Sequence, residues 1–203
     1  MNQAIDKILA LMRPKRQAIL RTKPHYCVKE FINQFKLHVW GIVETHSGAI
    51  FHVSDYLLDK LDSAQRHFLN EVGVTEKEFF KEYSFAPPEF RRGIRILGLL
   101  HKRTLSKSRL DIQRLLPFHF DVFGSLRPGE HDKQLYGHIL DVQQQHSLHS
   151  RSIFGMVYVY NRLPQNVVNC KTVSTFQRHL TLEAREKCQD GNGNWIHSFS
   201  CRL

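Results

Sequence analysis

The chain lacks long apolar runs, dense cysteine, internal repeats and low-complexity tracts, and each absence excludes a class of protein. No window approaches the ~18 uninterrupted apolar residues of a membrane-spanning helix, so we expect a soluble protein with no membrane partner. The 4 cysteines are too sparse for a disulfide-stapled secreted scaffold. This scarcity favours a reducing, intracellular compartment, either nuclear or cytoplasmic.

The motifs of common catalytic sites are also missing. Gly-x-Ser-x-Gly, glycine-rich phosphate loops and His-Glu-x-x-His do not occur, and no two aspartates are adjacent. The closest carboxylate pairs are Glu76 with Glu78 and Glu130 with Asp132. We interpret both pairs as surface charges, because a two-metal site needs carboxylates that converge in a shielded cleft. The sequence therefore predicts no catalytic residues and no enzyme activity of its own.

Positive charge is what the chain has in excess. Its 29 Lys and Arg against 19 Asp and Glu give a net charge of +10 and a pI near 9.6. A surplus of this size suggests an anionic partner, most commonly nucleic acid. Such residues can instead simply solvate the outer faces of amphipathic helices.

The basic residues form two clusters along the sequence. The first lies within residues 1–36, and the second lies between Glu89 and Asp111, where no acid intervenes. Uncompensated cations repel one another, which favours a bound polyanion over simple solvation in the second cluster. The predicted nucleic-acid-binding residues are Arg13, Lys15, Arg16, Arg21 and Lys23 in the first cluster, and Arg91, Arg92, Arg95, Lys102 and Arg103 in the second.

Apolar residues recur at helical spacing along most of the chain, so we predict a mainly α fold. The clearest pattern runs over residues 28–43, and a turn-prone break follows at 45–48. Ser54 and Asp55 indicate the start of a helix, and Gly73 indicates its end. Thr75 and Glu78 have the spacing of a capping box. Phenylalanines at helical spacing and Trp40 are expected in the core: Phe31, Phe35, Phe68, Phe79, Phe80 and Phe90.

Pro87 and Pro88 mark the expected boundary between two sections. Neither proline donates a backbone hydrogen bond, and a residue that precedes proline avoids the helical region. We expect residues 1–86 to form a helical bundle and residues 87–203 a looser helical region. Within the second section, residues 118–150 and 189–203 are expected to be irregular, and the histidines at 131, 138, 146 and 149 to be exposed loop residues.

Residues 149–180 carry the most informative pattern. An Arg-Ser pair opens a short apolar run, an aromatic-Asn-x-Leu-Pro segment follows, and Phe-Gln-x-x-Leu comes after a spacer. These positions are Arg151, Ser152, Tyr160, Asn161, Leu163, Pro164, Phe176, Gln177 and Leu180. Three earlier segments, at 13–38, 52–73 (with its signature at 61–69) and 85–105, complete an ordered set. Together they resemble the thumb and C-terminal region of non-LTR (LINE-type) retrotransposon reverse transcriptases. In that family the position that corresponds to Tyr160 is usually a tryptophan.

The resemblance implies a fragment of such an enzyme, with a thumb-like bundle and without palm and fingers. It implies that the chain binds an RNA or DNA backbone non-specifically and has no polymerase active site. It also implies that the missing palm and fingers portion is a further binding partner. One alternative is a protein-interaction or self-associating helical module. Another is a non-functional relic of a mobile element.

A zinc site is the one cofactor that the sequence suggests. Cys188, His197 and Cys201 have the spacing Cys-x8-His-x3-Cys, and the resembled family carries a C-terminal knuckle with a comparable second half. Zinc takes four nitrogen or sulfur ligands in a tetrahedron, so His179 or Cys170 would have to supply the missing one. The alternative is a frayed tail with two free thiols.

Overall fold

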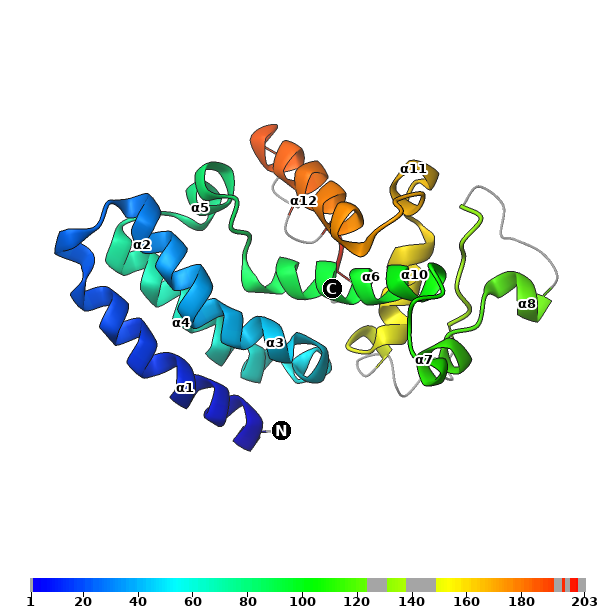
Figure 1. Ribbon diagram of the computed structural model, residues 1–203, viewed down its shortest axis with the longest axis horizontal. Helices are drawn as coiled ribbons and strands as arrows, with labels where there is room; N and C mark the ends of the chain where they lie inside the picture. Colours follow the sequence, from blue (N-terminus) through cyan, green and yellow to red (C-terminus); the bar gives the residue numbers. More distant parts are fainter. Residues whose placement is uncertain (1, 124–130, 138–148, 192–194, 196–197, 201–203) are drawn as a thin grey trace. The chain divides into compact units, whose positions relative to one another are not determined.

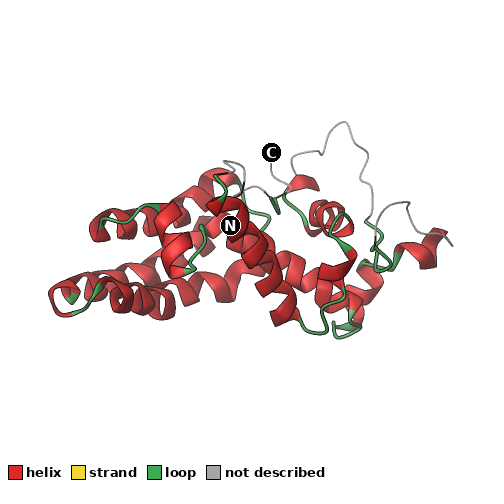
Figure 2. Ribbon diagram, turned by 90° about the horizontal axis from the view of Figure 1, so that it is seen from above, coloured by secondary structure: helices red, strands yellow, loops and turns green. Residues whose placement is uncertain are grey.

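The computed structural model describes residues 2–123, 131–137, 149–191, 195 and 198–200. The predicted mainly α fold is confirmed: helices account for most of these residues (Figure 2), and none of them belongs to a strand. The chain divides into two compact units, unit 1 over Met1–Arg92 and unit 2 over Gly93–Leu203. The division falls inside the helix α6, after Arg92, whereas the sequence suggested residue 86.

Unit 1 is a bundle of helices with short connections. Its elements are α1 (Asn2–Arg21), η1 (Lys23–His25), α2 (Val28–Phe35), the π-helical segment η2 (Lys36–Trp40), α3 (Gly41–Ile50), α4 (Asp55–Val72), α5 (Glu76–Tyr83) and the start of α6 (Pro88–Thr104). Figure 1 shows α1 beside α4 and beside the run from α2 to α3, and α1 contacts all of them.

The helix that was expected to end before residue 45 continues to Ile50, so the predicted break at 45–48 is wrong. The Thr45 hydroxyl donates to the carbonyl of Ile42, which keeps this polar residue inside the helix. Gly48 makes a helix less stable by roughly 1 kcal/mol relative to alanine. Burial of Val43 and Ile50 in the bundle core offsets that cost.

Aromatic rings form the centre of unit 1. Phe35 stacks on Phe68 with 3.8 Å between ring centroids, and Phe31 stacks on Phe68 at 5.1 Å. The edge of Phe85 meets Phe35 and Trp40. All these rings are buried, as helical spacing predicted for the phenylalanines on α2 and α4 and for Trp40. They connect α2, η2 and α4 with the segment that precedes α6.

The local signals at helix ends are confirmed. Gly73 ends α4 with a φ of 76°, a left-handed conformation that glycine adopts without steric cost. The Thr75 hydroxyl accepts from the backbone N–H of Glu78, and the Glu78 carboxylate accepts from the N–H of Thr75. This capping box satisfies two backbone donors at the start of α5.

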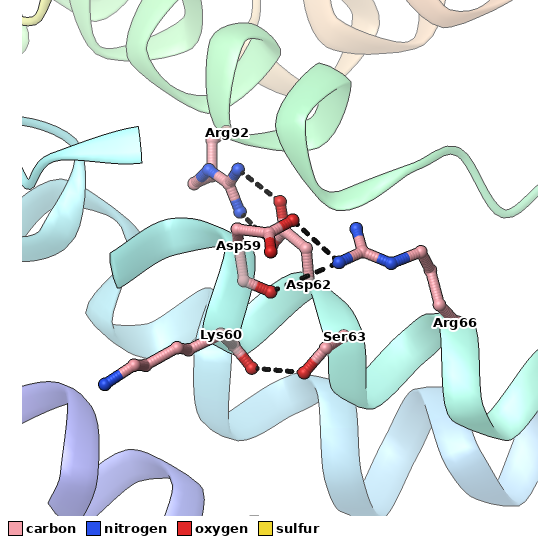
Figure 3. Close-up of polar contacts among 6 residues, drawn as sticks. All are labelled: Asp59, Lys60, Asp62, Ser63, Arg66 and Arg92. Atoms are coloured by element: carbon pink, nitrogen blue, oxygen red, sulfur yellow. Dashed lines mark hydrogen bonds and ion pairs between the residues drawn. The ribbon is translucent and has the colours of Figure 1, made fainter. Parts of the chain in front are cut away.

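Two ion pairs lie on one side of α4 (Figure 3). Arg92 donates to both oxygens of Asp62, at 2.6 and 2.8 Å, and its side chain is 6% exposed. One turn earlier, Asp59 accepts from Arg66 at 2.7 Å, and both of these side chains are largely exposed. The first pair ties α4 to the start of α6 and is shielded from water, whereas the second lies in solvent.

Unit 2 contains most of α6 and the described helices that follow it. Besides the remainder of α6, its described helices are α7 (Leu110–Leu115), α8 (His119–Phe123), α10 (Ile153–Asn161), α11 (Gln165–Val168) and α12 (Val173–Gln189). Ser152 caps α10 by accepting from the backbone N–H groups of Phe154 and Gly155. The predicted break at Pro164 is confirmed, because α10 ends before this residue and α11 begins after it.

A buried polar network centred on His101 holds α6 against α10 and α12. The His101 ring lies parallel to the Phe176 ring at 4.2 Å. Its Nε2–H donates to the Cys170 carbonyl at 2.9 Å, which leaves Nδ1 to accept from the Tyr160 hydroxyl at 3.1 Å. The Tyr160 oxygen also lies 3.0 Å from the Thr104 hydroxyl. Burial lowers the pKa of His101 and raises the pKa of Tyr160, so both are neutral.

A second set of hydrogen bonds fastens residues 131–137 to α10. His131 Nε2 bonds the Tyr160 carbonyl, and Nδ1 accepts from the backbone N–H of Lys133. The Asn161 amide pairs with both backbone groups of Leu135 at 2.8 and 2.9 Å. His131 is 1% exposed, so the expectation of an exposed loop residue is wrong for this histidine. His138 and His146 lie outside the described residues.

We predict that Asp62→Ala lowers the free energy of unfolding by about 3 kcal/mol, because it leaves a buried guanidinium without its counter-charge. Asp59→Ala, on the same helix, should cost less than about 1 kcal/mol, because its ion pair is exposed. Urea unfolding of the two variants measures both values. Equal losses would contradict the difference in shielding between the two pairs.

We also predict that stability falls as the pH drops below about 6.5. The unfolded chain protonates His101 near its ordinary pKa of 6.5, whereas the folded chain does so only at lower pH. Stability is therefore complete above that value and decreases below it, by at most about 1.4 kcal/mol per pH unit for this group. His101→Gln should be less stable at pH 7.5, with a shallower decrease between pH 6.5 and 5.5. Urea unfolding at several pH values tests this, and parallel curves for the two proteins would refute it.

Candidate nucleic-acid interface

Cationic side chains converge on a pocket between α1 and α4. The pocket has a volume of about 300 Å³ and is partly open to solvent. From α1 it receives Arg13 and Arg16, one helical turn apart, and from α4 it receives Lys60 and His67. The α1–α4 pocket is lined by Leu9, Met12, Arg13, Arg16, Lys60, Ser63, Ala64 and His67. No carboxylate occurs among these lining residues, so the formal charge of the lining is positive.

The sequence of α4 explains why its basic residues face α1. Lys60, Ser63 and His67 follow one another at steps of three and four and share one face of the helix. The acids Asp59 and Asp62 precede Lys60 and Ser63 by one position and therefore lie on another face of α4. On that face Asp59 pairs with Arg66, and Asp62 pairs with Arg92 (Figure 3). The figure shows Lys60 pointing away from those pairs. The acids of α4 are therefore neutralised on another side of the helix.

The chemistry of the pocket suits an oxyanion. The Nε of Arg16 is buried and has no hydrogen-bond partner among the described residues. The guanidinium groups of Arg13 and Arg16 and the ammonium of Lys60 line the same pocket, and groups of these kinds are the usual protein partners of phosphate. Leu9, Met12 and Ala64 form the apolar part of the wall, which keeps water from screening these charges fully.

The remaining residues of the first predicted cluster lie elsewhere on unit 1. Lys15 lines a different pocket of about 290 Å³, together with residues of α2 and η2. Arg21 is exposed in the last turn of α1, where a cation complements the helix dipole. The Lys23 ammonium donates to the carbonyl of Glu71. The structure thus brings Arg13 and Arg16 together and separates the other three from them.

Two arginines of the second cluster take part in the packing of unit 1. Arg91 pairs with Glu44, and its guanidinium lies 4.1 Å from the centre of the Phe85 ring. Arg92 is buried against Asp62. The argument that this cluster lacks compensating acids is therefore wrong for both, because the acids come from α3 and α4, far away in sequence.

Arg103, in unit 2, is also buried rather than available to a ligand. Its Nε donates to the Leu116 carbonyl at 2.8 Å, and its guanidinium lies 4.4 Å from the centre of the Phe118 ring. It fastens the segment after α7 to α6. Arg95 and Lys102, on the same helix, have exposed side chains, and their predicted role stays a prediction.

Lys60, Ser63 and His67 are site residues that the sequence prediction missed. Their helical spacing was readable, but they lie among acids, and the local sequence looks neutral. The pairing of those acids with Arg66 and Arg92, which neutralises them, is visible only in the structure.

The residues within 149–180 that carry the family resemblance form packing contacts in unit 2. Tyr160, Asn161 and Phe176 belong to the buried network, and Leu163 and Leu180 are buried in the core. The Gln177 amide donates to the Ile94 carbonyl at 3.4 Å, and a Cβ at position 98 would overlap the Gln177 side chain. Gly98 and Gln177 belong to two of the segments that carry the resemblance, 85–105 and 149–180. These two segments are therefore in contact at Gly98, where the missing side chain leaves space for Gln177.

The predicted zinc ligands are only partly within the described chain. Cys188 is buried on α12, and His197 and Cys201 lie outside the described residues. Among the residues that the structure describes, no group of three or more His, Cys, Asp or Glu side chains is placed to hold a metal. No helix of that part of the chain is long and apolar enough to cross a bilayer.

Comparisons of the chain with protein-family models, with curated proteins and with solved structures give no match. What the α1–α4 pocket does is therefore inferred from its own residues and from the sequence pattern.

We predict that Arg103→Gln and Lys102→Gln have very different effects on folding, although the residues are neighbours. Arg103→Gln leaves the Leu116 carbonyl without its donor and removes the contact with Phe118, at a cost of about 2 kcal/mol in the free energy of unfolding. Lys102→Gln should change stability by less than about 0.5 kcal/mol. Urea unfolding measures both, and a stable Arg103→Gln variant would show that this arginine is not needed for packing.

Proposed function

We propose that the chain binds the sugar-phosphate backbone of nucleic acid without sequence preference, and that the α1–α4 pocket makes the central contact. The observation that carries this proposal is the convergence of Arg13, Arg16, Lys60 and His67 on one pocket without a lining carboxylate. Contacts of this kind fix the position of a nucleic acid but do not read its bases.

The arrangement supports backbone binding more than capture of a small anion. The pocket is open on one side, and its charges come from two helices that contact each other. Further exposed cations lie on α1 outside the pocket, including Lys7 and Arg21. Additional cations around a site favour a polymer of phosphates over a single small ion.

The resemblance to reverse transcriptases supports the same role. In those polymerases the thumb is a helical bundle that holds a nucleic-acid backbone, and the first resembling segment, residues 13–38, contains Arg13 and Arg16. The proposed activity is binding alone, because the sequence has no pair of adjacent aspartates for nucleotide transfer.

Self-association is the second candidate, and one observation favours it. In unit 2, α7 contains no buried residue, and Leu110 and the nearby Phe120 are 69% and 57% exposed. Apolar side chains of this size in water favour contact with another protein surface. Sedimentation at several concentrations discriminates the two functions: a mass that rises with concentration and ignores added nucleic acid supports self-association.

We predict that binding of a DNA duplex weakens steeply with salt and that the α1–α4 pocket accounts for part of the slope. Each phosphate that a cation neutralises contributes about 0.9 log units of affinity per log unit of salt. The double variant Arg13→Gln/Arg16→Gln should therefore lower the slope by about 1.8. Fluorescence anisotropy with a labelled duplex over a salt series measures it.

The matched control is Lys29→Gln/Lys77→Gln, which removes the same charge from exposed positions on α2 and α5. This variant should keep a slope close to that of the unchanged protein. Equal slopes for the two double variants would show that net charge, rather than the pocket, determines binding. No binding at low salt would refute the proposal altogether.

A further inference from the structure

An aromatic side chain lies on the same face of α4 as the basic residues of the pocket. Tyr56 is 71% exposed. It precedes Lys60 by four residues, so Tyr56, Lys60, Ser63 and His67 form one stripe along the helix. The Lys60 ammonium lies 4.9 Å from the centre of the Tyr56 ring. The ring is not itself a lining residue of the α1–α4 pocket, but it lies next to Lys60, which is one.

An aromatic ring in this position can do something that cations cannot. Nucleobases have flat π faces that stack on aromatic side chains, and this contact tolerates any base. In a duplex the faces of the bases are already stacked on one another, and only their edges reach the grooves. An exposed ring on a helix surface therefore discriminates single strands from duplexes.

The spacing along α4 fits a single strand. Four residues of helix advance by about 6 Å along the axis, so the ring and the Lys60 side chain start about that far apart. A base stacked on Tyr56 keeps its own phosphate within reach of Lys60, and the neighbouring phosphates then lie toward Arg13 and Arg16. The carboxylate of Asp59, one turn from Tyr56, is engaged by Arg66 at 2.7 Å.

We propose that the chain prefers single-stranded nucleic acid and that a base stacks on Tyr56 while the backbone phosphates lie in the α1–α4 pocket. This inference rests on the proposed backbone binding and adds the class of nucleic acid to it. Stacking is indifferent to sequence, so it is compatible with a protein that reads no bases.

The chain contains a matched control for the ring. Tyr158 in unit 2 is 57% exposed and lies four residues before Arg162, whose guanidinium is 4.9 Å from the ring centre. Both pairs thus place a cation four residues after a tyrosine at the same distance from the ring centre, and Arg162 also donates to the Tyr158 hydroxyl. Tyr158 belongs to α10 and is not part of the α1–α4 pocket.

The test compares a labelled oligothymidine with a DNA duplex of the same length, by fluorescence anisotropy on the full chain. Tyr56→Leu should weaken binding of the single strand about fivefold or more and leave binding of the duplex unchanged. Tyr56→Phe should bind both like the unchanged protein, because the ring is retained. Tyr158→Leu should have no effect on either, and circular dichroism confirms that each variant is folded.

The outcomes separate the two proposals. If Arg13→Gln/Arg16→Gln weakens binding of both nucleic acids but Tyr56→Leu weakens neither, backbone binding stands and the stacking inference is overturned. Equal losses for single strand and duplex in Tyr56→Leu also overturn it. If the arginine double variant binds both like the unchanged protein, the proposed backbone function fails instead.

Discussion

The ion pairs on α4 decide where unit 1 has positive charge to offer. This helix carries acids and bases at neighbouring positions, and its local sequence favours neither sign. Arg92 neutralises Asp62 in a shielded pair, and Arg66 neutralises Asp59. The stripe of Lys60, Ser63 and His67 then faces α1 without competing carboxylates. If these acids were unpaired, they would attract the same cations that form the pocket.

The buried polar groups of unit 2 have a different role from the ion pairs of α4. Their hydrogen bonds hold the helices of unit 2 together. A buried polar side chain is tolerated only when its hydrogen bonds are satisfied. His101, Tyr160 and Asn161 meet that condition through one another and through backbone groups of the segments around them. The positions within residues 149–180 that carry the resemblance to reverse transcriptases therefore serve the stability of unit 2. The proposed contacts with nucleic acid depend on unit 1, where the resembling segment 13–38 contains Arg13 and Arg16.

The proposed binding needs only a few groups, each with a simple task. In the proposed complex, arginines and a lysine neutralise phosphates, one exposed ring provides a face for a base, and none of these groups is proposed to read sequence. Such a surface suits a protein that holds a strand for another reaction, which agrees with the role of a polymerase thumb in the resembled family.

Local features were determined by the sequence itself. The helical class, the cap at Gly73 and the capping box of Thr75 with Glu78 depend on residues within a few positions of one another. The apolar faces of α2 and α4 followed from spacing alone. The tertiary structure decided which cations remain available, since Arg91 and Arg92 pair with acids of α3 and α4, whereas Arg16 of α1 and Lys60 of α4 line one pocket. It also continued α3 through residues 45–48, because buried neighbours outweighed a local preference for a turn. Charge compensation and burial depend on distances in space, whereas the sequence gives only the separation of residues along the chain.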